Sequence, residues 1–584
     1  MGGTWKKNVS VSILLVGALA GIVSAQTEKQ VDQTQPQAQP QTGSPSAPVT
    51  TVNQAIDRII AREHDQNTLF RRYNPIVETY IQDMKPDKEL GSVPVRDHYF
   101  LGQANLSKGV VDNSMLAKSK GKLNALNPIS HIAGFFESSY VPEGFLQMIY
   151  LDTSGFDRQH YQFDYVGREF LGEVRCLVFD IQPLPKSGKG RFRGRIWAED
   201  QAFTIVRFNG VYTPLAGLNG FNLHFDSWRE NVQPGLWLPA FIYSQESDLK
   251  DFMGNQIHFK AQTRLWGYDL SNVGHEQEFS QLTIESADAI QDQNAAPVDR
   301  SPIEAEREWQ HQAEINVIDR LQRTGLLAPP NEVDKVLETV VNNLEVTNNL
   351  DVQPEIRCRV LLTTTLESFS IGHTIVLSRG LIDVLPDEAS LAAMLAQELG
   401  QIVVTKPTTD RWGFNDMTNV STIEALSHFS FRDNPADIQA ADQKAAELLK
   451  NSPYKDKLGN AALFLKQLQT ESKALPALIN PRLGNSVELA SYLASAGPSL
   501  QPDKVDQIAA LPIGGRVKLD PWTDKVELLK AKPVALLSAR EKMPFEVTPF
   551  MPYLTRYQKP TANVTADAAK ADMAKQQKQS PGQQ

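Results

Sequence analysis

Cysteine is almost absent from this sequence of 584 residues, which contains only Cys176 and Cys358. The two lie far apart in alternating runs that are typical of strands, and folded domains of this size need no disulfide framework. We therefore expect two buried free thiols that pack as small apolar side chains. A disulfide between them stays open as the alternative.

An excess of positive charge is also absent. The 58 lysine and arginine residues are outnumbered by 68 aspartate and glutamate residues, which gives a formal net charge of -10. A chain with this balance has no general attraction for nucleic acid or anionic lipid surfaces, so we expect no nucleic-acid partner. The hydrophobic share of 41% is ordinary for a globular protein, and the length predicts two folded domains with tails.

Long apolar runs are missing too. The apolar run 11–23 is about 13 residues long, whereas a membrane-crossing helix needs about 20. Lys6 and Lys7 precede this run, and the small residues Ser24 and Ala25 end it in the pattern that a signal peptidase recognises. We predict a cleavable signal peptide, with a membrane anchor as the alternative. The mature protein is then secreted or periplasmic and has no transmembrane segment.

Shifts in composition divide the rest of the chain. A stretch rich in Gln, Pro, Ser and Thr follows the signal peptide, and a similar stretch ends the chain; neither can bury enough apolar surface to fold. A further shift at 291–302 indicates a domain boundary. The predicted segments are a signal peptide (1–25), a disordered leader (26–51), a β-rich domain (52–290), a metallopeptidase-like domain (303–515), an extended wrap on that domain (516–558) and a disordered tail (559–584).

The first domain begins with a helix over about 52–72 and continues as strands. Apolar positions alternate in 161–165, in 177–181 and in 221–225, and two further strands turn at Glu199-Asp200. Many strands with one apolar face need a second layer. The order of elements, a helix followed by a long meander and a strand pair, resembles the outer-membrane lipoprotein carrier and sorting (LolA/LolB-like) fold over roughly 200 residues. The resemblance implies a curved antiparallel β half-barrel with helices that holds acyl chains.

Several aromatic side chains in this domain are consistent either with an apolar ligand cavity or with an ordinary hydrophobic core. They are Trp197, Trp228, Trp237, Phe241, Tyr243 and Trp266.

The second domain shows helical periodicity. Asn331 is placed to cap a helix whose apolar positions follow the 3.6-residue period up to Leu344. Strands follow at 356–362 and 373–377, and another helix begins at about Asp387.

One ordered series of motifs in this region resembles the gluzincin zinc metallopeptidases of the HtpX and CAAX-prenyl-protease types. Residues 375–381 and 387–401 match a strand, a Gly-Leu pair and a helix that carries His-Glu-x-x-His in the family. Residues 441–449 match the second metal helix, and Asn480-Pro481-Arg482 matches a later His-Pro element. The match covers roughly 170 residues in the family's order. The predicted fold class is α+β, a β half-barrel with helices followed by a mainly helical gluzincin-like domain with a small sheet.

The zinc ligands of that family are replaced here. Two histidines at i and i+4 share one helix face and reach one zinc ion, while the glutamate between them activates the bound water. The resemblance puts Gln397 and Gln401 at the histidine positions and Ile438 at the third-ligand position. It leaves Glu398 as a vestigial general base and Asp442 as a supporting residue. We expect Glu398 to accept hydrogen bonds from side chains or backbone donors within the former cleft.

Neither a glutamine amide nor isoleucine replaces an imidazole or a carboxylate as a zinc ligand. Without the ion, water is not activated at neutral pH. We therefore expect no zinc, no other cofactor and little or no peptidase activity. A relocated metal site is the alternative, and its candidate residues are His373, His428, Asp433 and Asp437.

The leading prediction for function is a non-catalytic binding or chaperone-like scaffold at the cell envelope. Its partner would be an envelope protein, an unfolded polypeptide, or a lipoprotein or lipid, and an extended chain could pair beside the strand 373–377. Two alternatives are an active zinc metalloendopeptidase and a periplasmic lipid or lipoprotein carrier in which the first domain binds the ligand and the second only docks it. Motifs for serine hydrolysis, phosphate or dinucleotide binding and thiol exchange are missing from the sequence.

Overall fold

Two sheets of very different size organise the described chain, which is α+β as the sequence predicts in general terms. The computed structural model describes residues 51–87, 91–107, 111–114, 145–213, 223–250, 256–268, 270, 302–404, 431, 435–480, 483–486, 517–520, 525–528, 545–547 and 549–557. The predicted signal peptide and almost all of the leader, together with most of the tail, lie outside these ranges. No helix within them combines the length and the hydropathy needed to cross a membrane.

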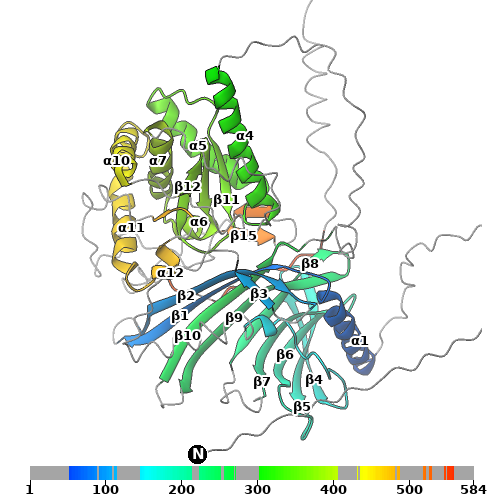
Figure 1. The fold of residues 1–584 in the computed structure, drawn as a ribbon. Coiled ribbons are helices and arrows are strands. Elements are labelled where there is room, and N and C mark those ends of the chain that lie inside the picture. The colour runs from blue at the N-terminus through cyan, green and yellow to red at the C-terminus, as the bar shows by residue number, and fades with distance from the viewer. Residues whose placement is uncertain are drawn as a thin grey trace, which may run out of the picture. The chain divides into compact units, whose positions relative to one another are not determined.

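The larger sheet is antiparallel and contains ten of the described strands (Figure 1). Its order is β3-β2-β1-β10-β9-β8-β7-β6-β5-β4, so β3 and β4 are the edges and the sheet is not closed. The strands are β1 (Ile76–Asp87), β2 (Gly91–Asn105), β3 (Val111–Ser114), β4 (Tyr161–Leu171), β5 (Val174–Pro183), β6 (Phe192–Glu199), β7 (Ile205–Tyr212), β8 (Phe225–Gln233), β9 (Leu236–Lys250) and β10 (Gln256–Trp266).

Helix α1 (Val52–Phe70) covers part of one face of this sheet. Thr51 and Gln54 form a capping box at its start, and Ile56, Ile59 and Phe70 bury one side. Glu63, on the same side, accepts two hydrogen bonds of 2.6 and 2.7 Å from the Arg229 guanidinium of β8, and both side chains are fully buried. A buried pair of this kind fixes the helix on the sheet, because either charge alone would be left desolvated.

The opposite face of the sheet belongs to the same buried cluster as the core of the second region. All six aromatic residues singled out from the sequence lie in this cluster, with exposures of 8% or less. Trp266 donates its indole N–H to the carbonyl of Gly325, and the ring of Phe241 lies edge-on to that of Phe550. These aromatic residues therefore pack as part of a buried core.

The second region surrounds a four-stranded sheet of order β11-β13-β12-β14. Its strands are β11 (Arg357–Leu361), β12 (Glu367–Ile371), β13 (Thr374–Ser378) and β14 (Asn485–Ser486). Its helices are α4 (Pro302–Arg323), α5 (Glu332–Thr347), α6 (Arg379–Val384), α7 (Glu388–Val404), α10 (Pro435–Lys450), α11 (Leu458–Glu471) and α12 (Pro476–Ile479), with a 3-10 turn, η3 (Lys455–Lys457). A separate hairpin consists of β15 (Val517–Asp520) and β16 (Lys525–Leu528).

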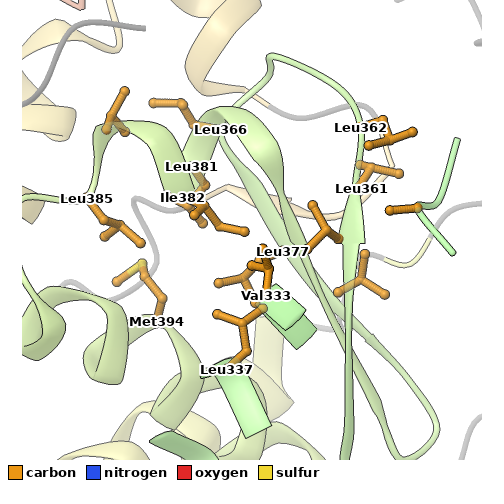
Figure 2. Close-up of a cluster of buried hydrophobic side chains, with 14 of the residues drawn as sticks. Val333, Leu337, Leu361, Leu362, Leu366, Leu377, Leu381, Ile382, Leu385 and Met394 are labelled. Atoms are coloured by element: carbon orange, nitrogen blue, oxygen red, sulfur yellow. The ribbon is translucent and has the colours of Figure 1, made fainter. Parts of the chain in front are cut away.

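The core of this region forms where α5 faces the small sheet and α6. Asn331 caps α5 as predicted, because its side chain accepts from the backbone N–H of Val333 at 2.8 Å. The side chain of Asp334 in turn accepts from the backbone N–H of Asn331 at 3.0 Å, which completes a capping box. Figure 2 shows Val333 and Leu337 of α5 pointing towards Leu377 of β13 and Ile382 of α6. These side chains are at most 6% exposed. Each buried leucine contributes roughly 1.5–3 kcal/mol relative to exposure.

The prediction that an extended partner chain pairs beside the strand 373–377 is wrong. The observed strand β13 pairs on both sides, in parallel with β11 and antiparallel with β12, so its edge is not available to an extended partner chain. Strand β12 was not predicted, and its run Glu-Ser-Phe-Ser-Ile lies between β13 and β14 in the sheet order.

The predicted wrap, 516–558, is described in two parts. The hairpin of β15 and β16 neighbours α5 and α6 of the second region. The C-terminal strap, defined here as residues 545–547 and 549–557, forms hydrogen bonds with the large sheet. The side chain of Gln82 in β1 donates to the carbonyl of Phe545 at 2.6 Å and accepts from the N–H of Val547 at 2.7 Å. Further along, the N–H of Glu173 donates to the carbonyl of Leu554 at 2.9 Å.

A buried polar network joins the large sheet to the second region. Glu78 of β1 accepts from the N–H and the hydroxyl of Thr364, both at 2.6 Å, and forms an ion pair of 2.9 Å with Arg264 of β10. Burial lowers the pKa of Arg264 to about 10. The described residues all belong to one compact unit that begins at Thr51, and the predicted domain boundaries stay a prediction. Cys176 and Cys358 are free and buried, as expected.

Candidate functional site

Helix α7 carries the motif positions, and its neighbour α10 carries the positions expected to complete the site. Gly400 explains how closely the two helices pack, because a Cβ atom at this position would lie 2.7 Å from the carbonyl oxygen of Ala441 in α10. A side chain at position 400 would therefore push α10 away. Close helix packing at this glycine brings the side chains of α7 and α10 within hydrogen-bonding reach.

Glu398 faces inward from α7. Its side chain is 2% exposed, and one carboxylate oxygen accepts the hydroxyl of Ser368 at 2.6 Å. Ser368 lies in β12, the strand missing from the sequence prediction. A general base must reach the water or substrate proton that it removes. Here the carboxylate binds a protein hydroxyl in a buried setting.

Gln397 points from α7 towards α10, where its side-chain amide donates to the carboxylate of Asp442 at 3.3 Å. Asp442 is only 8% exposed, and burial raises the pKa of its carboxyl to about 7. A carboxyl with this pKa is largely neutral in mildly acidic solution, and no described cation forms an ion pair with it. The pair therefore connects two helices where the family would place a metal.

Gln401 and Ile438 complete the positions taken from the resemblance. Gln401 is 4% exposed, and its amide nitrogen has no hydrogen-bond partner among the described residues. Ile438 is half-buried on α10, one turn before Asp442. The structure brings Gln397 and Asp442 together and turns Glu398 towards β12. The roles assigned to all five positions stay predictions.

The residues at this place do not fit a zinc ion. The Gln397 amide group is turned to donate, one oxygen of Glu398 accepts from Ser368, and Ile438 has no donor atom. Over the described ranges, no group of three His, Cys, Asp or Glu side chains is arranged to hold a metal. We derive no chemical step through zinc.

Two of the four residues of the alternative metal site lie in the described part of the chain. His373 faces Glu314 of α4, with 3.7 Å between the imidazole nitrogen and the carboxylate, and Asp437 is half-buried near the start of α10. His428 and Asp433 lie outside the described residues, as do Pro481 and Arg482 of the late motif.

The motif pattern does not single out two residues that shape this site, Ser368 and Gly400. Ser368 could not be found by spacing, because it comes from a different element and meets Glu398 only through the fold. Gly400 lies within the motif, between Glu398 and Gln401, but a helical glycine indicates close packing only once its neighbour is known.

Comparison with known proteins gives limited similarity. No family model and no curated protein matches the chain. A DUF1329 family protein from Desulfovibrio piger is 12% identical with a TM-score of 0.19, and the match covers 39% of this chain and 99% of that one. A structure described as an outer membrane lipoprotein-sorting protein domain, from Vibrio parahaemolyticus, is 11% identical with a TM-score of 0.21. That match covers 39% of this chain and 97% of the other.

The resemblance of the N-terminal half to the lipoprotein carrier and sorting fold rests on the order of its elements and stays a prediction. The gluzincin resemblance rests on the motif residues and stays a prediction.

Proposed function

We propose that this chain is a non-catalytic binding protein of the cell envelope, built in part on a peptidase-like helix pair. The observation that carries the proposal is the buried hydrogen bond between the Ser368 hydroxyl and Glu398. It engages one oxygen of the residue that the resemblance assigns as a general base, and the carboxylate is buried. The close packing of α7 on α10 at Gly400 supports a scaffold role for this helix pair.

Zinc content tests this proposal directly. The purified full-length protein should hold far less than one zinc per chain and should not cleave unfolded casein. A triple variant, Gln397→His/Gln401→His/Ile438→Glu, restores the family's ligand types on the same helix faces and should gain zinc. Stoichiometric zinc in the wild type, lost together with proteolysis in Glu398→Gln, would overturn the proposal.

The triple variant also needs a control for its altered packing. Changing the same three positions to alanine alters the packing without adding ligands, so this variant should stay metal-free. Zinc gained by both variants would mean that the metal binds elsewhere on the chain.

A periplasmic lipid or lipoprotein carrier is the second candidate. The sequence predicts the lipid site of such a carrier in the first domain, but the observation that supports a carrier is an apolar pocket of about 380 Å³ between α5, α6 and α7 of the second region. This volume lies within the range of ligand sites in proteins. Mass spectrometry of organic extracts from the purified protein tests it, because a carrier isolated from the envelope should retain a lipid in stoichiometric amount. An extract without lipid would count against the carrier.

A further inference from the structure

The pocket between α5, α6 and α7 lies at the opposite end of α7 from the motif positions. Its floor is apolar and buried: Val333, Leu337, Val340, Ile382 and Leu385 line it and are at most 6% exposed. Figure 2 shows four of these residues, Val333, Leu337, Ile382 and Leu385, grouped where α5 faces α6. Their interior surface offers only hydrocarbon, so the part of a ligand that enters must be apolar.

The rim of the pocket is partly open and carries negative charge. Val336 is 44% exposed, Leu391 is half-buried, and Thr339 turns its hydroxyl back to the carbonyl of Lys335. Asp387 and Glu388 also line the pocket, and no basic residue does so among the lining residues that the structure describes.

The two rim carboxylates differ in how they are used. Asp387 caps α7, since it accepts from the N–H and the hydroxyl of Ser390 at 2.9 and 2.7 Å, and it also accepts from the side chain of Asn460. Glu388 is exposed and accepts one bond of 2.9 Å, from the hydroxyl of Tyr454. Glu388 therefore retains a solvated, negatively charged surface at the pocket mouth.

We propose that this pocket binds a single-chain amphiphile whose apolar chain enters between α5 and α6 and whose head group is cationic. A volume of about 380 Å³ lies at the lower end of ligand-pocket sizes, which suits one chain better than a two-chain lipid. The carboxylates at the mouth attract a positive head group and repel a carboxylate head group. The inference rests on the proposed non-catalytic binding function and gives it a site and a ligand class.

Calorimetric titration with three probes of equal chain length tests the proposal. Dodecyltrimethylammonium, dodecyl maltoside and dodecanoate are each added to the full-length protein below their micelle concentrations. The cationic probe should bind most tightly, the neutral probe less tightly and the fatty acid least. Binding of dodecanoate equal to or tighter than that of the cation would overturn the proposal.

Two variants on the same helix locate the binding. Val336→Trp fills the mouth and should weaken binding of the cationic probe at least tenfold. Val346→Trp is the matched control, because Val346 is also on α5, is 65% exposed and does not line the pocket. Equal circular dichroism and melting of the two variants verifies folding. If Val336→Trp binds the cationic probe with wild-type affinity, the ligand binds elsewhere and the proposal is wrong.

A third variant tests the negative charge at the pocket mouth. Glu388→Gln removes an exposed charge and should weaken the cation by about three- to fivefold, the size expected for an exposed ion pair, while the neutral probe is unchanged. An unchanged preference for the cation would contradict the role of this carboxylate.

If none of the three probes binds, the pocket is packing space beside the β15–β16 hairpin, which neighbours α5 and α6. Zinc content is independent of this pocket. A failed titration with a metal-free protein therefore overturns the ligand assignment and leaves the non-catalytic proposal intact.

Discussion

The two ends of helix α7 have opposite surroundings. Near its C-terminal end, polar side chains turn inward and bind one another: Glu398 meets Ser368, and Gln397 meets Asp442. At its N-terminal end, apolar side chains surround a pocket whose polar groups stay at the rim. At the motif end, two pairs of polar groups bind one another, and the Gln401 amide nitrogen has no hydrogen-bond partner among the described residues. The pocket at the N-terminal end instead combines an apolar floor with a charged mouth, so this end of α7 is the better candidate for a ligand site.

The largest expected effect that tests this comparison concerns pH and Asp442. Its folded-state pKa of about 7 lies above the ordinary value near 3.9, so the folded protein holds this proton more tightly than the unfolded chain. The unfolding free energy should therefore fall as the pH rises from about 4 to about 7. At about 1.4 kcal/mol per pKa unit, the loss is roughly 2–4 kcal/mol.

Urea denaturation of wild type and Asp442→Asn across this window measures the loss. The difference between the two proteins should grow in favour of the variant as the pH rises. A difference that does not change with pH would mean that Asp442 is solvated, and the motif end of α7 would then resemble an open site.

Gly400→Ala should have the next largest effect. The added methyl group would lie 2.7 Å from the backbone of Ala441, and a backbone atom cannot move aside cheaply. We expect the unfolding free energy to fall by about 1–3 kcal/mol. Gly459→Ala in α11 is the control, since nothing lies within 4 Å of its Cβ position, and it should be neutral or slightly stabilising. Equal effects of the two changes would show that α7 and α10 pack loosely.

Ser368→Ala should cost somewhat less. It removes one hydroxyl donor from the buried Glu398, and a buried carboxylate with one donor fewer costs about 1–2 kcal/mol. Combining it with Glu398→Gln in a double-mutant cycle isolates the contact, and we expect a coupling energy of at least about 0.5 kcal/mol. Additive effects would mean that the two residues do not interact in solution.

Val336→Ser at the pocket rim should have the smallest effect on stability. The residue is 44% exposed, so the unfolding free energy should change by no more than about 0.5 kcal/mol. The affinity for dodecyltrimethylammonium should nevertheless fall, because the mouth loses apolar surface. A large loss of stability would mean that Val336 supports the fold, and the contrast between the two ends of α7 would weaken.

Local signals in the sequence predicted much of the fold. The cap at Asn331, the helix from about Asp387 and the strand pair turned at Glu199-Asp200 are encoded by near neighbours in the chain, and the structure has elements at these places. The general α+β class followed from them. Strand β12 was missed because its glutamate and two serines resemble a polar turn, although burial of these residues depends on contacts made only in the folded protein.

The candidate site was predictable only in part. Motif spacing led to Gln397, Glu398 and Asp442, but it contains no information about Ser368, which joins them from another strand. The pocket at the other end of α7 left no motif at all, because apolar residues at helical spacing are identical in a core and in a pocket wall. Its charged mouth becomes visible only when α5 and the start of α7 are placed side by side.

The bonds between Gln82 and the strap have a consequence for the order in which the chain folds. Gln82 and Phe545 are 463 positions apart, so almost the whole chain must be made before β1 gains this partner. Contacts between residues so far apart in sequence slow folding. Until they form, the sheet exposes apolar surface to solvent. A chain exported from its N-terminus would reach the far side of a membrane with this face uncovered. A holdase that binds the early-emerging strands until residues 545–557 arrive is therefore expected to raise the yield of folded protein.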